Sequence, residues 1–122
     1  MKHILIVEDE QYLAEAIRAY FEELDMYTLT LCNTVPAAIE FLESQTPDLL
    51  LLDLIMPEQD GRQLLRYLQD QGQSIPTIVA SNLDGKSVVE ECKQLGADRV
   101  LVKSNMSLHA LANEIKGLLG EG

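Results

Sequence analysis

Five short apolar runs alternate with five amphipathic segments along this chain, and that alternation constrains its fold more than any other feature. The run at 49–52 is four leucines, which is typical of a parallel strand buried on both faces. In the segment 13–24, apolar residues recur at steps of three and four, which predicts one buried face of a helix. The residues expected on that face are Leu13, Ala16, Ile17, Tyr20, Phe21 and Leu24.

The same patterns predict the remaining elements, and the strand order expected for them is one common to doubly wound sheets. The expected strands are 3–7, 27–32, 48–52, 77–80 and 99–102, and the expected helices are 13–24, one that begins after Asn33 or Thr34, 61–71, 84–95 and 107–119. Because no hairpin signal interrupts the alternation, we expect right-handed crossovers between parallel strands. The predicted fold is a single α/β domain over residues 1–122, three layers (α/β/α) with a five-stranded parallel sheet of order 2-1-3-4-5.

The charge of the chain limits its partners. There are 20 acidic and 9 basic side chains, a formal charge of −11, which argues against direct nucleic acid binding and suits the collection of a divalent cation. No apolar run approaches the roughly 20 residues that span a bilayer. The first residues lack the features of a signal peptide, and Cys32 and Cys92 are isolated, as reduced core cysteines are. We therefore expect a cytoplasmic protein that does not enter a membrane.

Polar and charged side chains end or follow four of the predicted strands. They are Glu8, Asp9 and Glu10 after the first strand, Asp53 after the third, Ser81 at the end of the fourth and Lys103 after the fifth. In open parallel sheets, ligands bind beyond the carboxyl ends of the strands, near the point where the strand order reverses. The first and third strands are neighbours in the predicted order, so acidic side chains should gather at that point.

The chemistry of this group points to phosphoryl transfer. Crowded carboxylates raise one another's pKa unless a cation lies among them, and oxygen ligands suit Mg²⁺ or Mn²⁺ better than Zn²⁺. Such an ion could hold a phosphoryl oxygen while a carboxylate attacks phosphorus and forms an aspartyl-phosphate. Lys103 could hold a second oxygen, and Ser81 could donate a hydrogen bond to a third. The pattern predicts Asp53 as the acceptor.

Several stretches, in this order and at these spacings, resemble the receiver (response regulator) domain of two-component signalling. They are Ile4-Leu5-Ile6-Val7-Glu8-Asp9-Glu10, then Leu50 to Pro57 with Asp60-Gly61 after it, then Ile75-Pro76, and finally Gly96-Ala97-Asp98 before Val102-Lys103. The resemblance covers nearly the whole chain. It implies a flavodoxin-like (CheY-like) (βα)5 fold.

The resemblance also implies a role for each matching residue. Asp53 would be the phosphoacceptor, and Lys103 would bind the phosphoryl group. Glu8, Asp9 and Asp53 would surround Mg²⁺, for which Mn²⁺ can substitute, together with the backbone carbonyl of Ile55. The apolar side chain of Ile55, two residues after the acceptor, would shield the acyl phosphate from water.

Ser81 would be the hydroxyl that responds to phosphorylation. The donor in this family is a phosphohistidine on a sensor histidine kinase or a histidine phosphotransfer protein. Phosphorylation would regulate a partner or an output domain, through the face made by the fourth helix (84–95), the fifth strand (99–102) and the fifth helix (107–119). The domain would assist its own phosphorylation and autodephosphorylation without being a turnover enzyme.

Three positions depart from the family's pattern. Asn82 replaces a small residue after the hydroxyl, where it could narrow access to Asp53, orient a water or cap the next helix. Val100 replaces an aromatic residue that usually couples to the hydroxyl. Ser104 replaces a proline that follows the lysine through a cis bond. Because a cis bond without proline costs roughly 2.5–4 kcal/mol, we predict a trans Lys103–Ser104 bond and a reshaped loop.

Three other functions remain as alternatives. An aspartyl-phosphate phosphatase would carry Asp-x-Asp after the first strand, where this chain has Glu8-Asp9-Glu10. A flavodoxin-like cofactor carrier would need a Ser/Thr/Gly-rich loop in the same place. A degenerate receiver that binds partners without phosphorylation would fit the altered Val100 and Ser104. No output domain follows the last helix, and a stand-alone receiver and a domain cut from a longer regulator would both end in this way.

Overall fold

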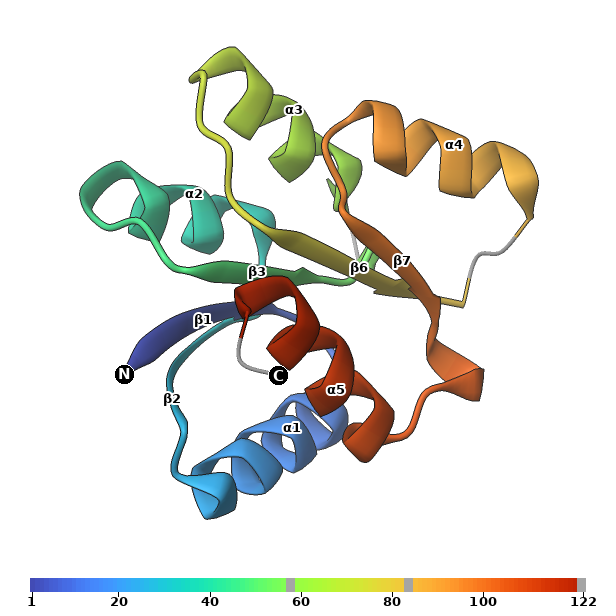
Figure 1. Cartoon of the computed structure of the whole chain (residues 1–122). Helices are drawn as coiled ribbons and strands as arrows, with labels where there is room; N and C mark the ends of the chain where they lie inside the picture. Colours follow the sequence, from blue (N-terminus) through green and yellow to red (C-terminus); the bar gives the residue numbers. More distant parts are fainter. Residues whose placement is uncertain (57–58, 83–84, 121–122) are drawn as a thin grey trace.

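The computed structural model describes residues 1–56, 59–82 and 85–120, which form a parallel sheet between two layers of helices (Figure 1). The strands are β1 (Lys2–Val7), β2 (Tyr27–Cys32), β3 (Leu49–Leu52), β6 (Thr77–Ser81) and β7 (Arg99–Val102). They lie in the order β2-β1-β3-β6-β7, and all four neighbouring pairs are parallel. The predicted order 2-1-3-4-5 is confirmed, since β6 and β7 are the fourth and fifth parallel strands along the chain.

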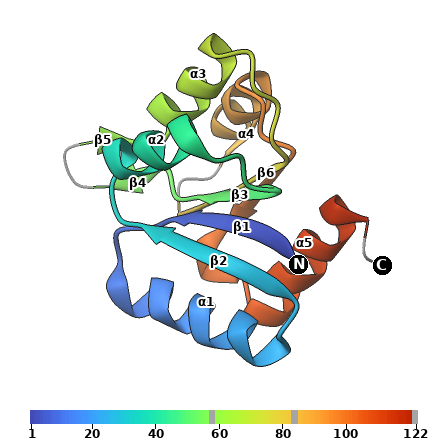
Figure 2. The same cartoon turned by 90° about the vertical axis from the view of Figure 1, so that its left-hand side faces the viewer.

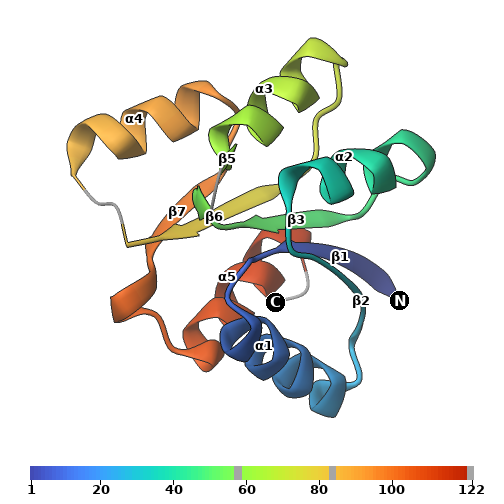
Figure 3. The same cartoon turned by 180° about the vertical axis from the view of Figure 1, so that it is seen from behind.

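The helices divide between the two faces of the sheet (Figure 1, Figure 3). One face carries α1 (Gln11–Leu24) and α5 (Leu108–Leu119), and the other carries α2 (Val35–Ser44), α3 (Arg62–Asp70) and α4 (Lys86–Gln94). A short 3-10 helix, η1 (Lys103–Asn105), follows β7. Within the residues the structure describes, no helix has the length and apolar character needed to cross a membrane.

The core forms two clusters because successive side chains of a strand point to opposite faces. In β3, Leu50 and Leu52 join the cluster under α2, α3 and α4, whereas Leu49 and Leu51 join the cluster over α1 and α5. All four leucines of β3 are at least 96% buried. A strand that serves two apolar layers must be apolar at every position, which is why the four-leucine run predicts the centre of the sheet.

The helix boundaries follow local signals closely. The Oγ1 of Thr34 accepts a hydrogen bond from the N–H of Ala37 at 3.2 Å, so Thr34 caps α2, and Pro36 lies in the first turn. On α1 the buried positions are Ala14, Ile17 and Phe21. The prediction that Ala16 faces inward is wrong, since Ala16 is exposed. The predicted start of the fourth helix at residue 84 lies outside the described residues.

A small hairpin between β3 and α3 was not predicted (Figure 2). The two-residue strand β4 (Ile55–Met56) pairs antiparallel with β5 (Gln59–Asp60), and Ile55 lies opposite Asp60. The expectation that no hairpin interrupts the alternation is therefore wrong. Two residues are too few to show a period-2 pattern, so this hairpin leaves no periodicity signal in the sequence. Pro57, part of the family-like stretch, lies outside the described residues.

Candidate functional site

Three acidic side chains meet at the carboxyl ends of β1 and β3. Each of Glu8, Asp9 and Asp53 offers one carboxylate oxygen, and these three oxygens lie within 4.8 Å of one another. The register of the two strands explains why the acids are close. Val7 and Leu52 are the last paired residues of β1 and β3, so Glu8 and Asp53 directly follow that pair. Glu8 and Asp53 are buried, and Asp9 is half-buried. Several carboxylate oxygens this close suit a hard divalent cation, as the sequence predicted.

The backbone around Asp53 holds its side chain in place. The N–H of Asp53 donates to the carbonyl of Val7 at 3.0 Å, which ties the residue to β1. The N–H of Ile55 donates to Asp53 Oδ1 at 3.2 Å, which fixes the direction of the carboxylate. The side chain of Asp53 is 7% exposed. The carboxylate of Asp53 is therefore buried and held in one direction by a backbone hydrogen bond.

Lys103 completes the polar group from the other side of β3. Its Nζ donates to Glu8 Oε1 at 2.6 Å and to Asp53 Oδ2 at 3.2 Å. Its side chain is only 12% exposed, and the carboxylate of Glu10 lies 3.9 Å from the same nitrogen. The ammonium group therefore lies among the acids rather than in solvent. In this position it can meet an anion that approaches Asp53.

An open pocket of about 520 Å³ lies over this group. Its lining residues are Asp9, Glu10, Asp53, Ile55, Asn82 and Lys103. The side chain of Ile55 is half-exposed at this wall. Ser81 ends β6 beside Val102 and is fully buried, and its role as the responding hydroxyl stays a prediction. The carbonyl of Ile55 as a metal ligand also stays a prediction.

Two groups of the site, Glu8 and Lys103, have pKa values that differ from their ordinary values. Burial raises the pKa of Glu8 to about 8, and the neighbouring Asp53 adds to the rise, although the hydrogen bond from Lys103 opposes it. Burial by itself lowers the pKa of Lys103, but the hydrogen bond to Glu8 and the charge of Asp53 outweigh it and raise that pKa above its ordinary value. A cation among the carboxylates would favour their charged forms and oppose the rise in the pKa of Glu8.

We expect the metal-free domain to lose stability as the pH rises from about 5 to about 8.5. Glu8 has its ordinary pKa of 4.5 when unfolded and a pKa of about 8 when folded, so the folded state binds the proton more tightly. That contribution is complete below pH 4.5 and is lost as the pH rises through the folded pKa. Thermal unfolding at several pH values measures it. Glu8→Gln should flatten the profile, and an unchanged profile in that variant would contradict the assignment to Glu8.

Two of the departures from the family's pattern lie against each other. The Lys103–Ser104 peptide bond is trans, as predicted, and the chain turns directly into η1. The N–H of Ser104 donates to Asn82 Oδ1 at 3.0 Å. Val100 is half-buried and packs against the core cluster on the α4 side of the sheet. The contact between Asn82 and Ser104 was not predicted, because nothing in the sequence links the two positions.

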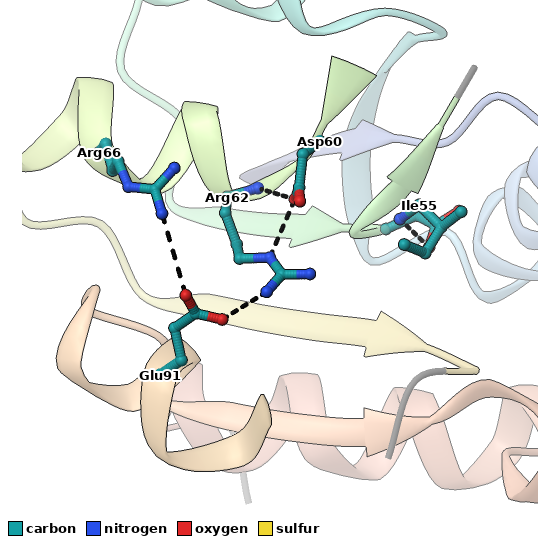
Figure 4. A network of polar contacts seen from close by, with 6 residues as sticks. Ile55, Asp60, Arg62, Arg66 and Glu91 are labelled. Atoms are coloured by element: carbon teal, nitrogen blue, oxygen red, sulfur yellow. Dashed lines mark hydrogen bonds and ion pairs between the residues drawn. The ribbon is translucent and has the colours of Figure 1, made fainter. Parts of the chain in front are cut away.

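An ion-pair network joins the hairpin after Asp53 to α4 (Figure 4). Arg62 Nε lies 3.1 Å from Asp60 Oδ1, and the backbone N–H of Arg62 donates to the same oxygen at 2.9 Å. Its guanidinium also pairs with Glu91 on α4, and Arg66 lies 3.9 Å from the other Glu91 oxygen. Since Asp60 lies opposite Ile55, this network connects the hairpin that follows Asp53 to α4. The network was not predicted, because only the spacing of Arg62 and Arg66, four residues apart on one helix, hints at it in the sequence.

The chain is similar to proteins of one signalling family. A family model described as the response regulator receiver domain matches residues 4–116. The chain is 34% identical over 110 residues to the Regulator of RpoS of Escherichia coli strain K12, a match that covers 90% of this chain and 32% of that protein. It is 32% identical over 116 residues to the response regulator MprA of Mycobacterium ulcerans, which covers 95% of this chain and 49% of that protein.

The chain is also similar to a solved structure of a receiver domain. The receiver domain of the Francisella response regulator 1452 matches with a TM-score of 0.89 and 27% identity, over 98% of both chains. The chain spans about a third of the length of the Escherichia coli relative and about half the length of the mycobacterial one. The likeness to these longer proteins therefore concerns one part of each.

Proposed function

The chain belongs to the response regulator receiver domain family, and we propose that Asp53 is its phosphoacceptor, with Mg²⁺ and Lys103 assisting the transfer. One observation carries the proposal. The buried carboxylate of Asp53 lies within 4.8 Å of two further carboxylates and 3.2 Å from the Nζ of Lys103. The acidic group and the lysine are both complete, which argues against a degenerate receiver.

The proposed transfer uses the chain's own residues for positioning. An oxygen of Asp53 forms a bond to phosphorus while the bond from phosphorus to a donor imidazole nitrogen breaks, and the imidazole leaves with the electron pair and then takes up a proton. Glu8, Asp9 and Asp53 would hold Mg²⁺ (or Mn²⁺) together with the Ile55 carbonyl. The ion would offset the repulsion between the carboxylate and the anionic donor.

Lys103 provides a second positive charge for the transferred group. Its raised pKa keeps the ammonium charged at neutral pH, so it can hold a phosphoryl oxygen as a point charge. In the resting domain this charge is shared between Glu8 and Asp53. Phosphorylation of Asp53 would change how Lys103 divides its contacts between Glu8 and the side chain at position 53. This would be the first local change that phosphorylation causes.

The proposed partners follow from this chemistry. The donor would be a sensor histidine kinase or a histidine phosphotransfer protein, and the output would be a partner or domain that reads the face formed by α4, β7 and α5. The phosphoryl group can only favour a conformation that it contacts better. We place the domain in the reducing cytoplasm, which suits its two free cysteines. It would accept a phosphoryl group rather than act as a turnover enzyme, and its charge of −11 disfavours direct binding to nucleic acid.

Intact-mass measurement tests the proposal. The purified chain is incubated with Mg²⁺ and a small phosphodonor such as acetyl phosphate, and its mass is compared with that of a sample containing a chelator. We expect a gain of one phosphoryl group that requires the cation and is removed by hydroxylamine, which cleaves acyl phosphates. A chain that gains no mass under any of these conditions would overturn the proposal.

We also expect Ile55 to control the lifetime of the phosphorylated form. Its half-exposed apolar side chain lines the pocket over Asp53, where it would keep water from the acyl phosphate. Ile55→Asn should speed dephosphorylation by roughly 3- to 10-fold, which corresponds to about 1 kcal/mol in the barrier. The decay of the phosphorylated mass measures the rate. Tyr12→Asn, at an exposed residue outside the pocket lining, is the control. An unchanged rate in Ile55→Asn would assign the shielding elsewhere.

A further inference from the structure

Asn82 and Ser104 each depart from the family's usual residue, and the structure brings them into contact. The side-chain carbonyl oxygen of Asn82 accepts the backbone N–H of Ser104 at 3.0 Å. A proline after the lysine would have no N–H to donate, so the bond needs both departures together. Asn82 also lines the pocket with Asp53 and Lys103. The two positions therefore act on the same part of the site.

The contact lies just beyond the end of the sheet. The last paired residues of β6 and β7 are Ser81 and Val102. Asn82 directly follows Ser81, and Ser104 directly follows Lys103. The carboxamide of Asn82 thus joins the two strands past their last backbone rung. This hydrogen bond connects the residue after Ser81 to the residue after Lys103.

The structure disfavours a simpler role for Asn82. The N-cap position of α4 is Gly85, and among the described residues no side chain donates or accepts at that cap. Asn82 is therefore not the cap that the sequence allowed as one possibility. Its oxygen is used by Ser104 across two loops instead.

We propose that Asn82 is a positioning residue for phosphoryl binding, which holds the Ser81 and Lys103 backbones as one unit. The proposal rests on the phosphoacceptor function of Asp53. A lysine side chain has many rotamers, and its ammonium reaches an anion reproducibly only where its backbone is anchored. The ammonium of Lys103 is drawn toward Glu8 and Asp53 from one side, and the bond between Asn82 and Ser104 anchors its backbone on the other.

This arrangement also bears on the missing aromatic residue. With Val100 in its place, a relay from the hydroxyl to an aromatic ring on β7 is absent. The bond between Asn82 and Ser104 gives the loop after β6 a direct connection to the chain after β7. A shift of Ser81 and Asn82 toward a phosphoryl group would then carry the start of η1 with it.

Four variants test the proposal by titration with beryllofluoride, a phosphoryl analogue, in the presence of Mg²⁺. Asn82→Ala removes the acceptor, Ser104→Pro removes the donor, and the double variant removes both. Ser104→Ala keeps the N–H and is the matched control. Each single removal should weaken binding by roughly 3- to 10-fold, as expected for one hydrogen bond. The double variant should be no weaker than either single variant, and Ser104→Ala should bind as the wild type does.

A second readout needs neither metal nor analogue. In the metal-free protein, the amide hydrogen of Ser104 should exchange several-fold faster in Asn82→Ala than in the wild type, at an unchanged melting temperature. Equal affinity in wild type and Asn82→Ala, or losses that add in the double variant, would overturn the positioning role. A wild type that binds no beryllofluoride would instead overturn the proposed function of Asp53, so the two failures are distinct.

Discussion

Asp53→Ala is expected to abolish phosphorylation by the small phosphodonor, with no gain in mass at any donor concentration. In the proposed transfer this residue supplies the attacking oxygen, and the two neighbouring carboxylates are held differently. Glu8 accepts a hydrogen bond from Lys103, and Asp9 is only half-buried among the three acids. Loss of a nucleophile removes the reaction rather than slowing it. Labelling that persists in Asp53→Ala would show that another residue is the acceptor.

This loss should occur in a folded protein. Without the Asp53 carboxylate, Lys103 keeps its 2.6 Å bond to Glu8, and one source of the raised Glu8 pKa is gone. Asp53→Asn keeps an oxygen that can accept the Ile55 N–H, so its stability should stay within about 1 kcal/mol of the wild type. Asp70→Asn, at an exposed acid at the end of α3, is the control and should be labelled normally.

Gly61→Ala should have the second-largest effect, because the backbone beside Gly61, at Asp53 and Leu54, leaves no room for a Cβ. A Cβ at Gly61 would lie 2.4 Å from the backbone oxygen of Asp53 and 2.9 Å from the Cα of Leu54. Both are main-chain atoms, so the backbone at Asp53 and Leu54 must move. We expect a loss of about 2–3 kcal/mol in the free energy of unfolding, typical of a strongly overpacked position. Displacement of Asp53 should slow phosphorylation by roughly 10- to 100-fold.

The strain in this variant is steric and not conformational. The backbone at residue 61 has φ −58° and ψ −21°, which alanine adopts freely. Gly117→Ala in α5 is the matched control, since nothing lies within 4 Å of its added Cβ and alanine favours a helix over glycine by up to about 1 kcal/mol. Thermal unfolding and the initial rate of mass gain measure both variants. A Gly61→Ala protein as stable and as reactive as the wild type would show that the loop yields without cost.

Much of the fold could be read from periodicity. The strands and the division of the core follow from alternating and fully apolar runs, which depend on local residue patterns. The strand order follows from the general rule for doubly wound sheets. The hairpin of β4 and β5 was missed because strands of two residues carry no period. Ala16 was predicted to face inward because the size and polarity of alanine suit either face of a helix. The buried alanine of α1 is Ala14 instead.

The candidate site could likewise be predicted only in part from the sequence. The rule that ligands bind at the carboxyl ends of parallel strands predicted the acids of β1 and β3 and the lysine after β7 at one edge. It could not predict that Lys103 would bond to Glu8 and Asp53 together, or that Arg62 would pair with Glu91 on α4. Those choices depend on distances between side chains from different elements.

The sequence by itself determined at which edge of the sheet the acidic residues and Lys103 meet, because strand ends follow from local apolar patterns and the strand order from the general rule for doubly wound sheets. Only the tertiary structure decided how that edge is held. It showed that Gly61 must lack a side chain because Asp53 passes beside it, and that Asn82 bonds to Ser104 instead of capping α4. A polar side chain on a loop bonds to whichever partner the packed elements bring near it, and no pattern of neighbours along the chain specifies that partner.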